Sequence, residues 1–111
     1  MRCDRVDFPP AGIAYTHTHP GPGIRCLLKG AIRIQVKGGE TAYVPGEPWF
    51  ERGPDPVLAH ASATQDTSFV RGMILPRSLQ GRSSIQYVDP ADADKPKPQQ
   101  YTRFVDTFID V

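Results

Sequence analysis

The dominant pattern along this chain is a short-range alternation of hydrophobic and polar residues. It is clearest in residues 31–37, where Ile32, Ile34 and Val36 fall on one side and Arg33, Gln35 and Lys37 on the other. A period of two predicts a β-strand with one face buried and one face in water. Similar runs predict further strands at residues 16–19, 24–28, 40–44, 49–51, 57–63, 68–75 and 101–111.

Turn residues separate these runs. Pro20-Gly21-Pro22-Gly23, Gly38-Gly39 and Pro45-Gly46 all interrupt the alternation, and residues 6–15 form an entry segment broken by Pro9-Pro10. The chain holds 10 glycines and 12 prolines in 111 residues, which excludes a helical bundle. Short strands at regular spacing predict an all-β sandwich or barrel.

The length and charge of the chain indicate how many domains it forms and which kinds of partner it favours. A chain of 111 residues is expected to form one domain. Its 13 basic and 12 acidic residues give a net charge of +1, which provides no argument for a nucleic-acid or membrane partner. We expect a cytoplasmic protein, because the sequence contains neither a long apolar run nor a signal-peptide pattern. Cys3 and Cys26 are expected to be free thiols, although their pairing stays open.

The segment 89–100 differs from the rest in being polar, charged and rich in proline. It predicts an extended connector or a disordered arm between a barrel formed by residues 1–88 and a last strand in residues 101–111. Such an arm reaches roughly 35 Å when extended. The last strand therefore packs either on its own barrel or on a second subunit, and we expect a homodimer, since an exposed apolar edge strand needs cover.

His17 and His19 are the main candidates for chemistry. A spacing of i, i+2 places two side chains on the same side of a β-strand, and imidazole is the commonest metal ligand. The pair therefore indicates a site for one divalent ion, with Zn, Ni, Fe or Mn as candidates. The alternative is two surface histidines ahead of a turn.

The spacing of these residues resembles the first motif of the cupins. Gly12, His17-Thr18-His19-Pro20-Gly21-Pro22 and Gly30 follow that pattern, and Pro45-Gly46-Glu47-Pro48-Trp49-Phe50-Glu51 resembles the opening of the second motif. The resemblance covers about Gly12 to Leu75. It implies a double-stranded β-helix, or jelly-roll, barrel of a single domain. It also implies a metal held in the barrel mouth by three histidines and one glutamate.

Two of the four ligand positions depart from the family. The glutamate position falls on Gly23 and the second-motif histidine on Val57. His60 lies three residues further on, so it faces the cavity and joins the ligands only if the loop at Pro54-Asp55-Pro56 shifts the register by one residue. Otherwise it is a surface residue.

Other side chains are candidates for the same pocket. Glu51 can replace a missing ligand or pair with Arg25 or Arg71. Arg25, if it faces inward, offers a fork for a carboxylate or phosphate. Candidate ligand-binding residues are Arg25, Trp49, Tyr15 and Arg71, where Trp49 is also an ordinary core candidate and the orientation of Arg71 is open.

Two functional interpretations follow. In the first, His17, His19 and Glu51 hold a divalent ion and the barrel-mouth pocket binds a small organic molecule, an acid if Arg25 anchors it. In the second, the chain is a non-catalytic binding or structural cupin that has lost the metal site. The sequence favours the first, names no catalytic residue and leaves the substrate open.

Overall fold

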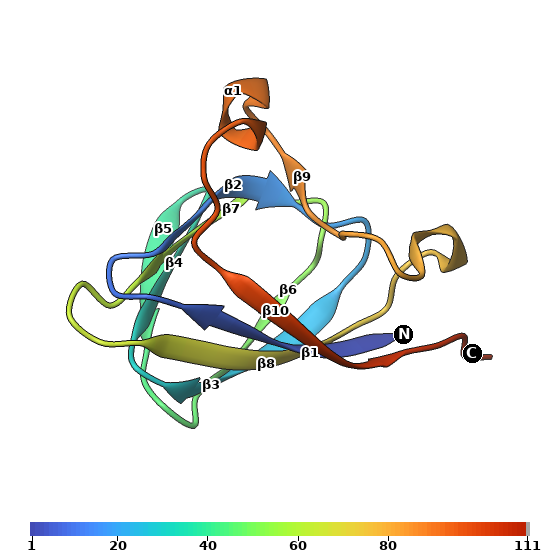
Figure 1. The fold of residues 1–111 in the computed structure, drawn as a ribbon, viewed down its shortest axis with the longest axis horizontal. Helices are drawn as coiled ribbons and strands as arrows, with labels where there is room; N and C mark the ends of the chain where they lie inside the picture. The colour runs from blue at the N-terminus through green and yellow to red at the C-terminus, as the bar shows by residue number, and fades with distance from the viewer. Residues whose placement is uncertain (111) are drawn as a thin grey trace.

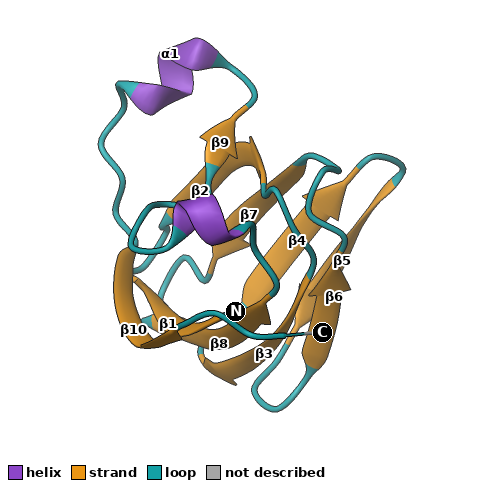
Figure 2. Cartoon of the chain, turned by 90° about the vertical axis from the view of Figure 1, so that its right-hand side faces the viewer, coloured by secondary structure: helices purple, strands orange, loops and turns teal. Residues whose placement is uncertain are grey.

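The computed structural model describes residues 1–110, and half of these residues lie in two antiparallel β-sheets. The sheets face each other around a common interior (Figure 1). The strands are β1 (Arg2–Phe8), β2 (Ile13–Thr18), β3 (Gly23–Lys29), β4 (Ile32–Val36), β5 (Gly39–Tyr43), β6 (Pro48–Glu51), β7 (Val57–Ala61), β8 (Thr67–Met73), β9 (Gln86–Tyr87) and β10 (Gln100–Asp106). A 3-10 turn η1 (Arg77–Leu79) and a short helix α1 (Pro90–Ala93) lie outside the sheets (Figure 2).

Each sheet has five strands, and neither sheet follows sequence order. One runs β10-β1-β8-β3-β6 and the other runs β5-β4-β7-β2-β9. The edge strands β5 and β6 are neighbours in sequence but belong to different sheets, so the two sheets do not close into one at this side. The all-β prediction is confirmed.

The core lies between the sheets and follows the alternation in the sequence. In β4, Ile32 and Ile34 are buried as predicted, whereas Val36 at the strand end is 45% exposed. The core residues are Val6, Phe8, Ala14, Leu27, Ile32, Ile34, Trp49, Val57, Ala59, Ala61 and Phe69. Burial of these side chains is the main stabilising term of the fold.

The prediction for the N-terminal segment was incomplete. We expected an entry segment at residues 6–15, but β1 begins at Arg2 and pairs with both β8 and β10. Its inward residues are Arg2, Asp4, Val6 and Phe8. Arg2 and Asp4 are charged although they face inward. The alternation of apolar and polar residues is therefore visible only at Val6 and Phe8, and the start of the strand was missed.

Residues 89–100, expected to be an extended connector or a disordered arm, include the short helix α1 (Pro90–Ala93) and the first residue of β10. Asp89 caps α1 by accepting a hydrogen bond from the backbone N–H of Ala91 at 3.0 Å, the usual role of aspartate at a helix start. Lys95 and Lys97 then lie over the ring of Tyr15, at 4.8 and 5.8 Å from its centroid. These contacts tie the connector to β2 at the top of the view in Figure 1.

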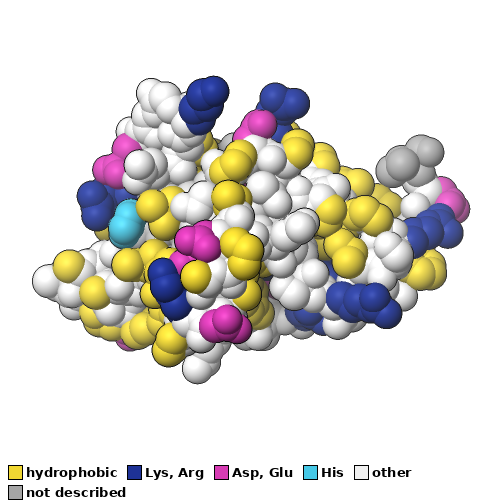
Figure 3. Space-filling model, turned by 90° about the horizontal axis from the view of Figure 1, so that it is seen from above, with side chains coloured by type: hydrophobic (Ala, Val, Ile, Leu, Met, Phe, Trp, Pro, Cys, Tyr) yellow, Lys and Arg dark blue, Asp and Glu magenta, His cyan; other side chains and the backbone are white. Residues whose placement is uncertain are grey.

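The last strand packs on the same chain, one of the two arrangements expected for residues 101–111. β10 pairs with β1 from Gln100 opposite Asp7 to Asp106 opposite Arg2. This pairing covers one edge of β1 and leaves Phe104 exposed. Acidic, basic and hydrophobic side chains are interspersed on the surface seen from above (Figure 3). Among residues 1–110, no helix has the length and apolar character needed to cross a membrane.

Candidate metal centre

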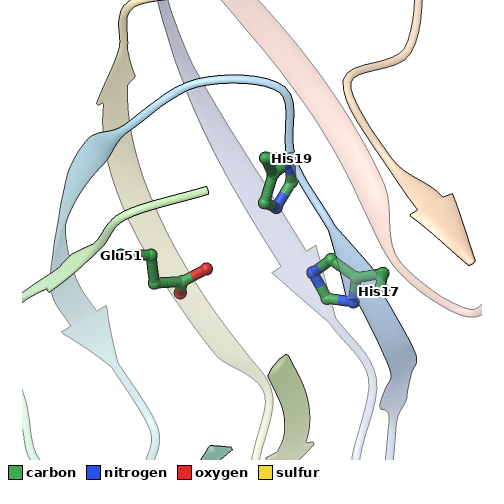
Figure 4. Close-up of side chains that lie close together, drawn as sticks. All are labelled: His17, His19 and Glu51. Atoms are coloured by element: carbon green, nitrogen blue, oxygen red, sulfur yellow. The ribbon is translucent and has the colours of Figure 1, made fainter. Parts of the chain in front are cut away.

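His17 and His19 both point into the space between the sheets. His17 is 6% exposed and His19 is 3% exposed. Their ring centroids are 4.9 Å apart and the rings meet edge to face. Figure 4 shows the two imidazoles side by side on β2 and the turn that follows it. The prediction that the pair shares one side of a strand agrees with this geometry.

A register shift in β2 sets this orientation. Ala14 pairs with Ala59 and His17 pairs with Val57, so the regular pairing is interrupted between Ala14 and His17. Ala14 and His17 are both buried although their positions are an odd number of residues (three) apart, as a β-bulge allows. Tyr15 therefore does not share the orientation of His17. The expectation that Tyr15 lines the pocket was wrong, because its ring contacts Lys95 and Lys97 on the outside.

Backbone carbonyls determine which nitrogen of each ring can bind a metal. The Nδ1 atom of His17 lies 2.6 Å from the carbonyl oxygen of Tyr15, and the Nδ1 atom of His19 lies 3.1 Å from that of Ser84. A carbonyl oxygen only accepts, so each neutral ring donates through Nδ1–H. The lone pair then resides on Nε2 in both rings, as a metal-binding imidazole requires.

Both imidazoles are held in the neutral state. Burial, with added contributions from the nearby His17, Arg25 and Arg71, lowers the pKa of His19 to about 2. Burial also lowers the pKa of His17, against the opposing effects of the Tyr15 carbonyl and Glu51. Neutral imidazoles bind a metal without first losing a proton.

Glu51 completes a cluster of three donor groups. The donor atoms of His17, His19 and Glu51 all lie within 4.8 Å of one another, and Figure 4 shows the carboxylate of Glu51 facing the two rings. Two ligands of one ion, each about 2.1 Å away, are at most about 4.2 Å apart. Neighbouring ligands in a tetrahedral or octahedral site are closer still, at about 3.0–3.4 Å, so the three side chains need to move together by about 1 Å or more around an ion.

The carboxylate of Glu51 is oriented by two donors. Its Oε2 atom accepts a hydrogen bond from Trp49 Nε1 at 2.8 Å and lies 3.3 Å from Arg25 Nε. Among residues 1–110, no hydrogen bond reaches Oε1. One oxygen is thus held by two donors, and the pairing with Arg25, one of the two alternatives expected for Glu51, is present in the structure.

Arg25 explains why Gly23 and Glu51 occur together. A Cβ atom at Gly23 would lie 2.9 Å from Arg25 Nη1 and 2.7 Å from the carbonyl oxygen of Gly72, so no larger side chain fits there. Arg25 Nη1 donates to the carbonyl of Gly23 at 2.9 Å. Gly23 lies directly opposite Glu51 in the β3–β6 pairing, so a carboxylate from the neighbouring strand reaches the same region. Burial lowers the pKa of Arg25 to about 10, although Glu51 opposes that shift.

A second ion pair borders the same cavity. Arg71 donates to both carboxylate oxygens of Asp4, through Nε at 2.7 Å and Nη2 at 3.1 Å. Both side chains are nearly inaccessible, at 5% and 1% exposure. Arg71 faces inward, and its Cζ atom lies 5.2 Å from the centroid of the Tyr101 ring. Asp4 was not predicted as a site residue. Its spacing of two from Val6, and of four from Phe8, would have placed it on the same inward face.

The structure separates His60 from the other candidates. Val57, Ala59 and Ala61 are buried in β7, so His60 lies on the outer face of this strand, opposite Arg33 and Ile13. The loop at Pro54-Asp55-Pro56 does not shift the register. His60 is therefore removed from the candidate ligands, whereas Trp49 and Arg71 line the cavity with Arg25.

Comparison with known proteins finds matches among solved structures but none by sequence. No family model matches this sequence, and no curated protein matches it. Among solved structures, a polyketide cyclase from Streptomyces resistomycificus aligns with a TM-score of 0.63 and 18% identity, covering 79% of this chain and 61% of that one. A predicted oxalate decarboxylase from Thermotoga maritima aligns with a TM-score of 0.59 and 21% identity, covering 67% and 65%.

An oxalate oxidase in complex with the substrate analogue glycolate aligns with a TM-score of 0.57 and 18% identity, covering 70% of this chain and 47% of that one. Other matches are described as cupin or RmlC-like cupin proteins. The chain has the cupin fold. It spans between about half and two thirds of the length of the three solved structures described.

The cupin pattern clarifies the site. The second-motif histidine position falls on Val57, which is buried and lies opposite His17 in the β2–β7 pairing. Val57 therefore contributes an apolar side chain beside His17 and no donor atom. The glutamate position falls on Gly23, and Glu51 faces it from β6. This cupin fold thus offers a donor set of two imidazoles and one carboxylate.

Proposed function

We propose that this chain is a small-molecule cupin that binds one divalent metal ion through His17, His19 and Glu51. The observation that carries the proposal is the shared orientation of three donors in one buried cluster, with both Nε2 lone pairs and one carboxylate oxygen available. Two histidines and one carboxylate are typical of non-haem Fe(II) sites that keep open positions. When bound, such an ion acts as a Lewis acid toward an oxygen of the ligand.

The residues around the donors favour an acidic ligand. Arg25 and Arg71 both line the cavity, and each is balanced by one carboxylate, Glu51 or Asp4. A bound divalent ion would therefore leave the cluster with a net positive charge, which attracts an anion. A predicted oxalate decarboxylase and an oxalate oxidase share the fold. These points support a small organic acid as the ligand class.

A metal-free binding or structural cupin is the second candidate. The observation in its favour is that Arg25 already pairs with Glu51, in a buried contact that neutralises the carboxylate. Two of the four family ligand positions are also occupied by Gly23 and Val57. In that case Glu51 serves only to compensate Arg25.

Titration of Glu51→Gln separates the two candidates. We expect the wild type to bind one Fe²⁺, Mn²⁺, Ni²⁺ or Zn²⁺ per chain, measured by anaerobic calorimetry. Glu51→Gln keeps the shape and a hydrogen-bond acceptor for Trp49 but removes the charged ligand. Loss of a residue that only orients a ligand costs 10–100-fold in metal affinity, so we expect loss of Glu51 itself to cost about 100-fold or more.

Glu40→Gln is the matched control, because Glu40 is exposed and pairs with Arg33 far from the donors. Its metal affinity should equal that of the wild type, and circular dichroism should show that Glu51→Gln remains folded. A wild type that binds none of the four ions contradicts the metal proposal and favours the second candidate.

We further propose that the chain forms a homodimer through the outer face of the sheet that contains β10. This face carries an apolar hollow of about 340 Å³ whose lining includes Cys3, Ile24, Val70 and Phe104. Ile24 is 58% exposed and Phe104 is 61% exposed. A projecting aromatic ring beside an apolar hollow is a self-complementary surface of the kind that a two-fold axis pairs.

Light scattering tests this arrangement. The wild type should have twice the 12.3 kDa chain mass at micromolar concentration, and Phe104→Glu should have the mass of one chain, because a buried charge disfavours the interface. A wild-type mass of 12.3 kDa would refute the dimer.

A further inference from the structure

The metal cavity is too small for an organic molecule. The space bordered by His17, His19, Arg25 and Glu51 has a volume of about 20 Å³, which is room for about one water molecule. A ligand with a carbon skeleton must therefore lie outside this space and reach it through a neighbouring opening.

A larger groove opens where the two sheets stay apart. It has a volume of about 500 Å³ and lies between the edge strands β5 and β6. Four of its lining residues also line the metal cavity, namely Ile34, Trp49, Glu51 and Val57. The groove and the cavity thus share a wall, and Glu51 is the one donor that belongs to both.

The walls of the groove are apolar and aromatic. Ile34, Val36 and Val57 supply aliphatic surface, and Tyr43 stacks on Trp49 with ring centroids 4.8 Å apart and an interplanar angle of 24°. Trp49 is 6% exposed and Tyr43 only partly buried, so the aromatic surface open to the groove is chiefly the Tyr43 ring, which the stacking holds in place. Such walls favour a flat apolar group.

One charged side chain of the groove, Lys37, has no partner of opposite charge among residues 1–110. Glu51 pairs with Arg25, and Arg52 pairs with Asp55 at 3.5 Å. Lys37 also lines the groove but takes part in no ion pair within residues 1–110. An unpaired ammonium group beside an apolar wall is complementary to an anion attached to an apolar body.

We propose that the groove binds an aromatic carboxylate, with the ring between the walls of β5 and β6 and the carboxylate at Lys37. The proposal deepens the proposed function, since the ring then lies beside Glu51 at the edge of the metal cavity. It narrows the ligand from any small organic acid to an acid that carries a planar apolar group.

Three related molecules test the ring and the charge separately, using the full chain freed of metal by a chelator. These are 3-phenylpropionate, the neutral 3-phenylpropanol and the ringless propionate. Trp49 is the only tryptophan, so its fluorescence reports binding in the groove. We expect 3-phenylpropionate to bind about 10-fold more tightly than 3-phenylpropanol, as one charge-assisted hydrogen bond allows, and propionate to give no saturable signal.

Lys37→Gln is expected to remove this advantage. It should weaken 3-phenylpropionate about 10-fold and leave 3-phenylpropanol unchanged. Lys29→Gln is the matched control, because Lys29 is an exposed lysine on β3 that does not line the groove, and it should change neither affinity. Equal effects of the two lysine variants, or no binding of 3-phenylpropionate by the wild type, would overturn the proposal.

The same titration in His17→Ala/His19→Ala separates this inference from the metal proposal. Aromatic acid binding that persists in this variant supports the groove whether or not the wild type binds metal. A wild type that binds metal but not 3-phenylpropionate contradicts the groove alone.

Discussion

Replacing His17 and His19 with alanine in one chain is expected to abolish metal binding. The two imidazoles supply two of the three donors, and their Nε2 atoms are the groups whose lone pairs the Tyr15 and Ser84 carbonyls leave free. A single carboxylate that remains, already paired with Arg25, cannot compete with water for a divalent ion. The measurement is metal content by mass spectrometry after loading and gel filtration, together with calorimetry.

His60→Ala is the control for this variant. It removes the third histidine of the chain, which lies on the outer face of β7, and should leave stoichiometry and affinity unchanged. Equal metal content in the double alanine variant and the wild type would show that another group binds the ion. A larger loss in His60→Ala than in the double variant would contradict the assigned donors directly.

Removing the carboxylate of Asp4 is expected to cause the largest loss of stability. Asp4→Ala leaves the Arg71 guanidinium buried and without the two carboxylate oxygens to which it donates. Breaking a buried ion pair by deleting one member costs about 3–5 kcal/mol. Urea denaturation followed by circular dichroism measures this change in the free energy of unfolding.

Two further variants test whether the unpaired charge of Arg71 causes this loss of stability. Asp4→Val/Arg71→Met removes both charges and should recover most of the lost stability, because apolar side chains can replace a buried pair at little cost. Glu40→Ala breaks the exposed pair with Arg33 and should cost less than about 1 kcal/mol. A loss in Asp4→Ala as small as that in Glu40→Ala would contradict a buried, mutually dependent pair.

The strand pattern and the orientation of most inward residues follow from local sequence. Period two predicted that Ile32 and Ile34 face the core and that His17 and His19 share one side, whereas the inward orientation of Arg25 was left conditional. The prediction for Tyr15 failed for a local reason that is hard to recognise in sequence. The bulge between Ala14 and His17 adds one residue to the strand and reverses the parity on either side of it.

Other parts of the site depend on residues that are distant along the chain. Asp4 meets Arg71 because β1 pairs with β8, and Ser84 holds His19 from a loop 65 residues later. These contacts follow from strand order. Alternation predicts which face of a strand is buried, but it says nothing about which strand lies beside it.

What the sequence by itself determined is most of the strands, the turns between them and the two imidazoles on one side, whereas β1 and β9 were not predicted. These depend on sterics and on a period of two, which act over a few residues. The tertiary structure decided that Glu51 faces Gly23, that Val57 lies opposite His17 and that a groove opens between β5 and β6. Those features arise from the register and order of strands brought together by burial of the core, and burial depends on the whole chain.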